Sequence, residues 1–185
     1  MAELDDWQEE LGALVQQARF LTENLTDAQF NWHPSPDRWS IAQCLDHLNK
    51  VNLLLLPRME SEISDALPLA PDAFRVWHPS FLERLFIQTV GPNARYKAEV
   101  PKLYIPAPEG TVKDVMHTFC EANDRILACM EQAKGHDLRR IKVTSPVSGL
   151  VRMSLGAWFA SAVVHTEYHI GQAKAVKAEP GFPSP

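Results

Sequence analysis

The sequence predicts an all-α protein, a four-helix bundle with a long proline-rich crossover loop. Two observations lead to this prediction. Apolar residues recur at helical spacing in four separate stretches, each long enough to form one helix of a bundle. Prolines and glycines gather between these stretches, where they end one helix before the next begins. At 185 residues the chain is long enough for one well-packed domain, which we expect to cover residues 1–185.

The first two expected helices lie near the N-terminus. The first runs from about Leu4 to Leu25 and carries one stripe of apolar side chains. The second begins after Ser40, because Ser40 and Gln43 have the spacing of a capping box, in which each side chain bonds the other residue's backbone. Pro57 is expected to kink this helix or to end it one turn later.

The third and fourth expected helices lie in the second half of the chain. Thr111 is the expected N-cap of the third helix, and Gly135 lies where that helix should stop. The fourth helix is expected to begin after Ser154 and to end near Glu179, where Pro180 and a glycine follow. Residues 180–185 are expected to form a disordered tail.

Three segments between these helices have features of their own. "HPSFLERLF" predicts a short helix, because Ser80 and Glu83 repeat the capping-box spacing. "IKVTSP" and "GLVRMS" predict a short β-hairpin before the last helix. "GPNARYKAEVPKLYIPAPEG" has no periodicity, and an irregular segment of this length is usually functional or disordered. We expect it to cover the functional site, with Tyr96 and Tyr104 in contact with substrate.

Charge and composition argue against several classes of partner. The net charge is −5 and no block of Lys and Arg is present, so nucleic acid and anionic membrane are not expected partners. No apolar run approaches the roughly 20 residues of a membrane-spanning helix. The N-terminus is acidic and does not resemble a signal peptide, so a cytoplasmic location is expected. Three cysteines without a C-x-x-C pair predict buried, reduced thiols.

Two histidines in "HTEYHIGQ" occupy the apolar face of the fourth helix. His165 and His169 are four residues apart, so both rings lie on one face, where two ring nitrogens can converge on one cation. The pair alone is equally compatible with core histidines that bond each other or the backbone. His47, in "CLDHL", occupies an apolar row of a different helix. Three neutral imidazoles would bind Zn²⁺ or Ni²⁺ and leave a position open for water.

Two further residues have both a functional and an ordinary interpretation. Gln172 lies on the row of His165 and His169, one turn further on, where it can orient a ligand histidine. It can equally make a hydrogen bond between helices that plays no part in chemistry. Cys44, one turn before His47, can close the site as a fourth ligand, although a small buried cysteine is the more common case.

With these residues in place, the chain resembles the DinB-like superfamily of bacterial metal-binding helix bundles. The likeness rests on "RWSIAQCLDHL", "EVPKLYIPAPE", "TSPVSGLVRMSLGAW" and "HTEYHIGQ", and it spans roughly Leu11 to Lys174. The resemblance implies an up-down-down-up order of helices, a homodimer, and a metal triad at His47, His165 and His169.

The resemblance also implies a range of activities. Characterised members include bacillithiol transferases and the mycothiol-dependent maleylpyruvate isomerase, and others are described as metal-dependent hydrolases. We therefore expect an enzyme that acts on a small molecule, by hydrolysis or by transfer of a low-molecular-weight thiol. The alternatives are a non-catalytic, metal-stabilised or stress-related binding module, and a bundle whose histidines hold no metal.

Overall fold

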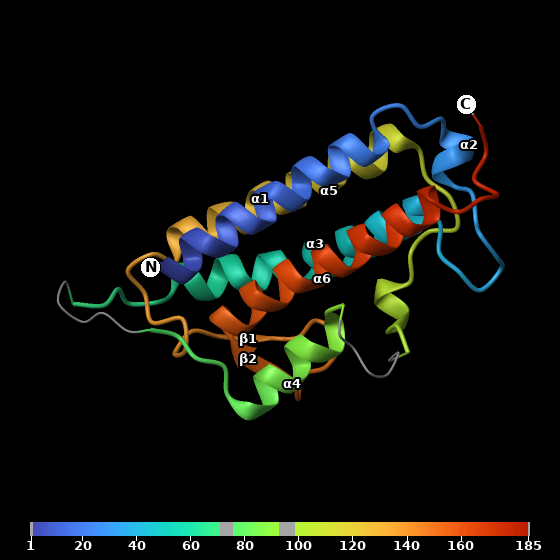
Figure 1. Cartoon of the computed structure of the whole chain (residues 1–185). Coiled ribbons are helices and arrows are strands. Elements are labelled where there is room, and N and C mark those ends of the chain that lie inside the picture. The colour runs from blue at the N-terminus through green and yellow to red at the C-terminus, as the bar shows by residue number, and fades with distance from the viewer. Residues whose placement is uncertain (1, 71–75, 93–98, 185) are drawn as a thin grey trace.

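Four long helices form the bundle in the computed structural model, which describes residues 2–70, 76–92 and 99–184 (Figure 1). They are α1 (Ala2–Thr22), α3 (Ile41–Ser64), α5 (Val112–Gln132) and α6 (Leu155–Lys177). α1 and α6 run in one direction, and α3 and α5 run in the other (Figure 1). The four-helix bundle and its up-down-down-up order are thus confirmed.

Each long helix packs against two others. α3 contacts α5 and α6, and α1 contacts the same two helices, so the apolar faces of all four meet in one core. Burying one large apolar side chain stabilises a fold by about 1.5–3 kcal/mol. The core includes these fully buried side chains: Leu11, Leu45, Leu48, Leu56, Phe119, Ile126, Met130 and Phe159.

Local capping signals set the helix starts where the sequence places them. Ser40 caps α3 and forms a capping box with Gln43, and Ser80 does the same with Glu83 for α4 (Phe81–Val90). Such a box satisfies backbone N–H groups that have no partner inside the helix. Two further N-caps, on α5 and α6, are Thr111 and Ser154.

The N-terminal half departs from expectation in two places. The first helix ends at Thr22, and a separate short helix α2 (Asp27–Phe30) follows, with Thr26 and Gln29 forming a capping box. That spacing is visible in the sequence, but it lies beyond the expected end of the first helix at Leu25, where no separate helix is predicted. α3 continues through Pro57 to Ser64, because buried side chains lie on both sides of the proline and hold the helix in place.

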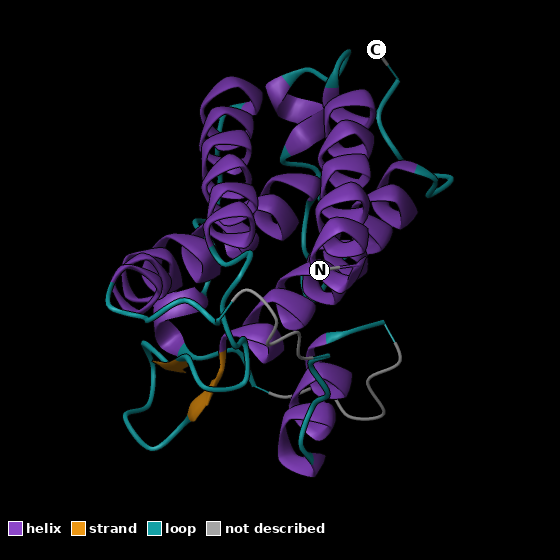
Figure 2. Cartoon of the chain, turned by 90° about the vertical axis from the view of Figure 1, so that its left-hand side faces the viewer, coloured by secondary structure: helices purple, strands orange, loops and turns teal. Residues whose placement is uncertain are grey.

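A small hairpin precedes α6, as predicted. β1 (Lys142–Thr144) pairs with β2 (Arg152–Ser154) in antiparallel order, with Val143 opposite Met153. Figure 2 shows how small these two strands are beside the helices.

The proline-rich segment before α5 is partly described. Its described part holds the single-turn helix η1 (Lys102–Tyr104) and lies against α3, where Asp46 accepts a hydrogen bond from the backbone N–H of Ala107 at 2.7 Å. Lys50 donates to the carbonyl oxygen of Ile105 at 2.7 Å. Residues 93–98, with Tyr96, lie outside the described part of the chain.

The C-terminal segment and the charge distribution complete the fold. The ring of Phe182 packs edge-on against Trp32 with centroids 5.6 Å apart, and Gln29 donates to the carbonyl oxygen of Pro183 at 2.9 Å.

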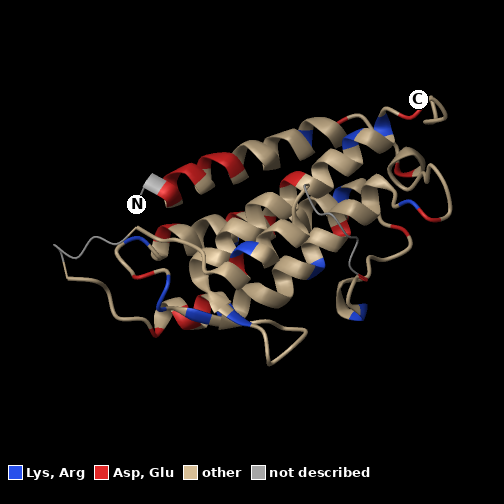
Figure 3. Cartoon of the chain, turned by 60° about the horizontal axis from the view of Figure 1, so that its bottom comes forward, with Lys and Arg blue, Asp and Glu red and all other residues tan. Residues whose placement is uncertain are grey.

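Acidic side chains gather along the first part of α1 (Figure 3). Among the described residues, no helix has the length and apolar character that crossing a membrane requires.

The start of α6 is fixed by contacts with α4 and with Trp77. Glu83 accepts hydrogen bonds from the backbone N–H groups of Ser154 and Ser80, both at 2.8 Å. Burial tends to raise the pKa of Glu83, but hydrogen bonds with Ser154 and Ser80 outweigh it and lower that pKa to about 2. Trp77 leaves no room beside Gly156, where an added Cβ atom would lie 2.6 Å from the indole.

Replacing Ser154 by Ala tests this arrangement. The buried hydroxyl of Ser154 caps α6 and also accepts the indole N–H of Trp77 at 3.1 Å. We expect Ser154→Ala to lower the free energy of unfolding by roughly 2–4 kcal/mol, because a cap is lost and a buried N–H loses its acceptor. Thr111→Ala removes an exposed cap and an exposed hydrogen bond to the Asp114 carboxylate, and it should cost about 1 kcal/mol. Equal losses in urea unfolding would contradict this account.

Candidate metal centre

Three histidines from two helices meet between α3 and α6. His47 comes from α3, and His165 and His169 come from consecutive turns of α6. Each offers one ring nitrogen, and these nitrogens all lie within 4.8 Å of one another. His47 and His169 are each 5% exposed, and His165 is half-buried. No other group of three potential metal ligands occurs in the part of the chain that the structure describes.

The tautomer of His47 follows from its backbone partner. Its Nδ1 lies 2.7 Å from the carbonyl oxygen of Tyr104, which can only accept a hydrogen bond. Nδ1 of His47 therefore carries the proton, and Nε2 has a bare lone pair. That Nε2 lies 3.3 Å from Nε2 of His165.

The tautomer of His169 follows in the same way from Gln172. The Nδ1 of His169 lies 2.7 Å from the amide oxygen of Gln172. The amide NH₂ group of Gln172 donates to the hydroxyl of Tyr168 at 2.9 Å, which places the amide oxygen toward His169. Nδ1 of His169 is therefore the donor, and its Nε2 also has a bare lone pair. This second bare nitrogen lies 3.0 Å from Nε2 of His165.

These contacts do not form a complete hydrogen-bond network. His165 can place at most one proton on Nε2, so it cannot satisfy both bare nitrogens fully. Leaving a buried polar atom without a partner costs free energy. One cation bound by all three nitrogens removes the conflict, because zinc binds imidazole at about 2.0–2.1 Å and tetrahedral ligands then lie roughly 3.3 Å apart. The donor set and its spacing therefore fit a divalent transition metal.

The surroundings keep the three rings neutral, the form that binds metal. Burial lowers the pKa of His47, although the hydrogen bond to Tyr104 raises it in part. Burial and the neighbouring His47 lower the pKa of His165 to about 3. Burial, followed by the neighbouring His165 and His47, holds the pKa of His169 well below its ordinary value.

Trp39 covers the cluster on one side, and sequence reasoning missed it. Its indole lies nearly parallel to the ring of His169, at 24° and 5.6 Å between centroids. It also lies 4.9 Å from the ring of His47. Trp39 immediately precedes the N-cap Ser40 in "RWSIAQC", but no spacing rule connects that position to the histidines.

Of the other residues that the sequence suggests for this site, Tyr104 contacts the cluster. Tyr104 contacts His47 through its backbone carbonyl, and burial raises the pKa of its phenol despite the opposing effects of Ser145 and Arg58. Tyr96 lies outside the described residues. Cys44 is buried outside the cluster, and burial raises the pKa of its thiol to about 12, so it is not a fourth ligand here.

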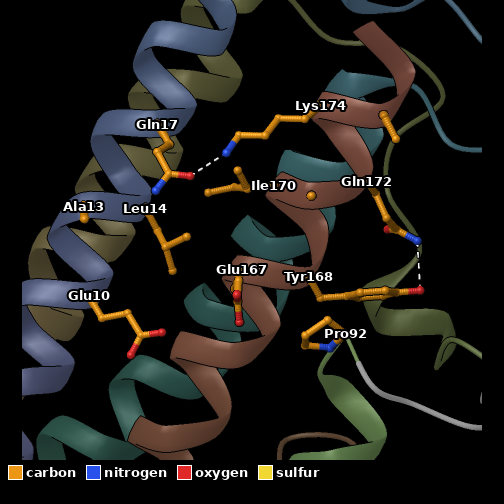
Figure 4. Close-up of a pocket in the computed structure, with 12 residues that line it drawn as sticks. Glu10, Ala13, Leu14, Gln17, Pro92, Glu167, Tyr168, Ile170, Gln172 and Lys174 are labelled. Atoms are coloured by element: carbon orange, nitrogen blue, oxygen red, sulfur yellow. Dashed lines mark hydrogen bonds between the residues drawn. The ribbon is translucent and has the colours of Figure 1, made fainter. Parts of the chain in front are cut away.

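A groove lies between α1 and α6 (Figure 4). Its volume is about 580 Å³, and Tyr168 and Gln172 form part of its wall. Because Gln172 also bonds His169, a chain of hydrogen bonds connects one histidine to the groove. Across the groove, burial and then the nearby Glu167 raise the pKa of Glu10.

Comparison with known proteins gives two matches and one negative result. A family model described as the DinB superfamily matches residues 10–173. The fold is similar to that of YfiT from Bacillus subtilis, described as a probable metal-dependent hydrolase with an unusual four-helix bundle topology, with a TM-score of 0.59 and 15% identity. That similarity covers 97% of this chain and 89% of YfiT, and at this identity it bears on the fold. No curated protein matches the chain.

The lowered pKa values of the histidines predict how the free energy of unfolding of the metal-free protein changes with pH. The unfolded chain protonates its histidines near pH 6.5, whereas the folded cluster does so at lower pH. Below pH 6.5 the unfolded state therefore binds more protons, and the free energy of unfolding falls as pH falls toward the folded pKa values. Each such histidine contributes up to about 1.4 kcal/mol per pH unit.

His165→Ala should therefore flatten the dependence of unfolding free energy on pH between about 4.5 and 6. Thr166→Val is the matched control, because Thr166 is buried in the next position but does not titrate. Urea unfolding at several pH values, in the presence of a chelator, gives the slope of unfolding free energy against pH for each variant. A slope for His165→Ala as steep as that of the unmodified protein would contradict the assignment of a ring that stays neutral in the folded protein.

Proposed function

The chain belongs to the DinB superfamily, and on this basis we propose that it is a metal-dependent enzyme. His47, His165 and His169 hold a divalent ion, zinc or nickel, through their Nε2 atoms. The observation that carries the proposal is the pair of bare Nε2 lone pairs that face His165 at 3.3 and 3.0 Å. The partners on Nδ1, a backbone carbonyl and an amide oxygen, are of the kind that orient metal-binding histidines.

The ligand count supports a catalytic site. Structural zinc sites usually have four protein ligands, whereas catalytic sites have three and one open position. Within the described residues, no fourth His, Cys or carboxylate joins this group. When bound, such an ion supplies Lewis acidity, which lowers the pKa of a water or thiol molecule that binds it.

The residues around the cluster have distinct parts in this proposal. The Tyr104 carbonyl and Gln172 hold His47 and His169 with Nε2 directed inward. Trp39 covers the side of those two rings, so reactants approach from the side of the half-buried His165. Tyr104, and Tyr96 beyond the described residues, are our candidates for contact with substrate.

We infer two candidate reactions on a small molecule, hydrolysis and transfer of a low-molecular-weight thiol. The description of YfiT favours hydrolysis, and the resemblance of the chain to thiol-dependent members of the superfamily favours transfer. A third candidate is a non-catalytic module in which the metal joins α3 to α6. The origin of the ligands on two helices favours this role.

Metal analysis of protein without a histidine tag tests the site. We expect about one divalent ion per chain, because three neutral imidazoles make one transition-metal site. His47→Ala, His165→Ala and His169→Ala should each lose the ion. His117→Ala is the control, since His117 also has a possible ligand four residues on, but lies exposed and 3.5 Å from Glu121. A wild-type chain that binds no metal at any loading would overturn the proposal.

Two assays on zinc- and nickel-loaded protein separate the candidate reactions. One measures hydrolysis of nitrophenyl esters, and the other measures conjugation of a small thiol to an aromatic electrophile. The active reaction should fall to the uncatalysed rate in His165→Ala and after treatment with a chelator. Full metal content with neither activity, together with a raised unfolding midpoint, would favour the binding module.

We also propose that the chain forms a homodimer. Support comes from α4, where Phe81 is 80%, Leu82 73% and Leu85 50% exposed, since burying such side chains favours association. Light scattering at micromolar concentration should give twice the chain mass, and Leu82→Asp with Leu85→Asp should give the chain mass. A monomeric wild type would exclude this proposal.

A further inference from the structure

We propose that Trp39 is a positioning residue of the metal site, which holds the rings of His47 and His169 in the orientation that binds the ion. This inference rests on the proposed metal site, and it assigns a role to a residue outside the three ligands and their hydrogen-bond partners. It starts from the position of the indole, which contacts two ligand rings that come from different helices.

The backbone of Trp39 is anchored by the start of α3. Ser40, the next residue, forms the capping box with Gln43 and is fully buried. The indole is half-buried and reaches from this anchor over both rings, at 4.9 Å from His47 and 5.6 Å from His169 between centroids. A single side chain therefore contacts a ligand ring on α3 and a ligand ring on α6.

A hydrogen bond at Nδ1 does not fix an imidazole completely. His47 and His169 each have one such bond, at 2.7 Å, and a ring held at one atom can still swing about that contact. The indole lies against these two rings and restricts the swing. The two rings that Trp39 contacts are also the two whose Nε2 lone pairs are bare, so the restraint acts where the ligand geometry depends on it.

The indole also favours the metal-loaded state electrostatically. An imidazole bound to a divalent ion takes on part of its positive charge, whereas the free ring is neutral. Trp is the strongest of the aromatic residues as a partner for positive charge above its ring. Metal affinity should therefore decrease in the order Trp, Phe, Leu at position 39, even when the three side chains fill the space comparably.

Zinc affinity of tag-free Trp39→Phe and Trp39→Leu, measured by competition with a chelator, tests the role. We expect a loss of about 3-fold for Phe and about 10- to 100-fold for Leu, the range typical of residues that orient metal ligands. Trp32→Leu is the matched control, because Trp32 is also half-buried but packs on Phe182. It should leave the affinity unchanged.

Two further measurements separate positioning from packing. Urea unfolding of the metal-free proteins should give similar stabilities for Trp39→Phe and Trp39→Leu, so that their different affinities do not reflect folding. Nickel should quench Trp fluorescence in the wild type and in Trp32→Phe, and the quenching should largely disappear in Trp39→Phe. This second readout still applies if Trp39→Leu does not fold.

The outcomes also distinguish this inference from the proposed function. If the wild type binds zinc and Trp39→Leu binds it equally well, the role of Trp39 is overturned and the metal site stands. Equal nickel quenching in Trp39→Phe and Trp32→Phe likewise overturns it. If the wild type binds no metal, both proposals are overturned.

Discussion

The interaction on which the site depends is the burial of three imidazoles that face one another between α3 and α6. Burial keeps the rings neutral, and the single N–H group of a neutral ring needs an acceptor. For His47 that acceptor is the carbonyl of Tyr104, so the proline-rich segment must lie over α3. For His169 it is Gln172, which must itself be oriented by Tyr168. The groups that surround the site are therefore those that accept the N–H groups of its histidines.

Contacts far from the histidines determine where they meet. Glu83 and Trp77 bind the first turn of α6 at Ser154, and Gly156 allows the indole to pack against the helix. Because a helix rises about 1.5 Å per residue, a shift of α6 by one residue along its axis would separate the ring nitrogens by more than a coordination bond tolerates. The contacts at the start of α6 therefore set the distances between the ring nitrogen of His47 and those of the histidines in the later turns of α6.

The sequence reveals those parts of the fold that depend on local signals. Capping pairs such as Ser40 and Gln43 mark helix starts, and the spacing of His165 and His169 on an apolar face marks a site, because both signals act within one turn. The direction in which each helix runs follows only from the family resemblance, because it depends on contacts between distant segments. The sequence does not predict that the carbonyl of Tyr104 contacts His47, or that the indole of Trp39 contacts His47 and His169. Neither position has a local pattern that points to a histidine elsewhere in the chain.

The separation of the ligands along the chain has a consequence for folding kinetics. His47 and His165 lie 118 residues apart, so the cluster exists only after a very large loop has closed, a step that is entropically unfavourable and slow. An ion that requires all three rings would bind late, after the bundle has formed. It would then retard unfolding far more than it accelerates folding. Loss of the ion would shorten the lifetime of the folded chain in the cell, even where the equilibrium fraction folded scarcely changes.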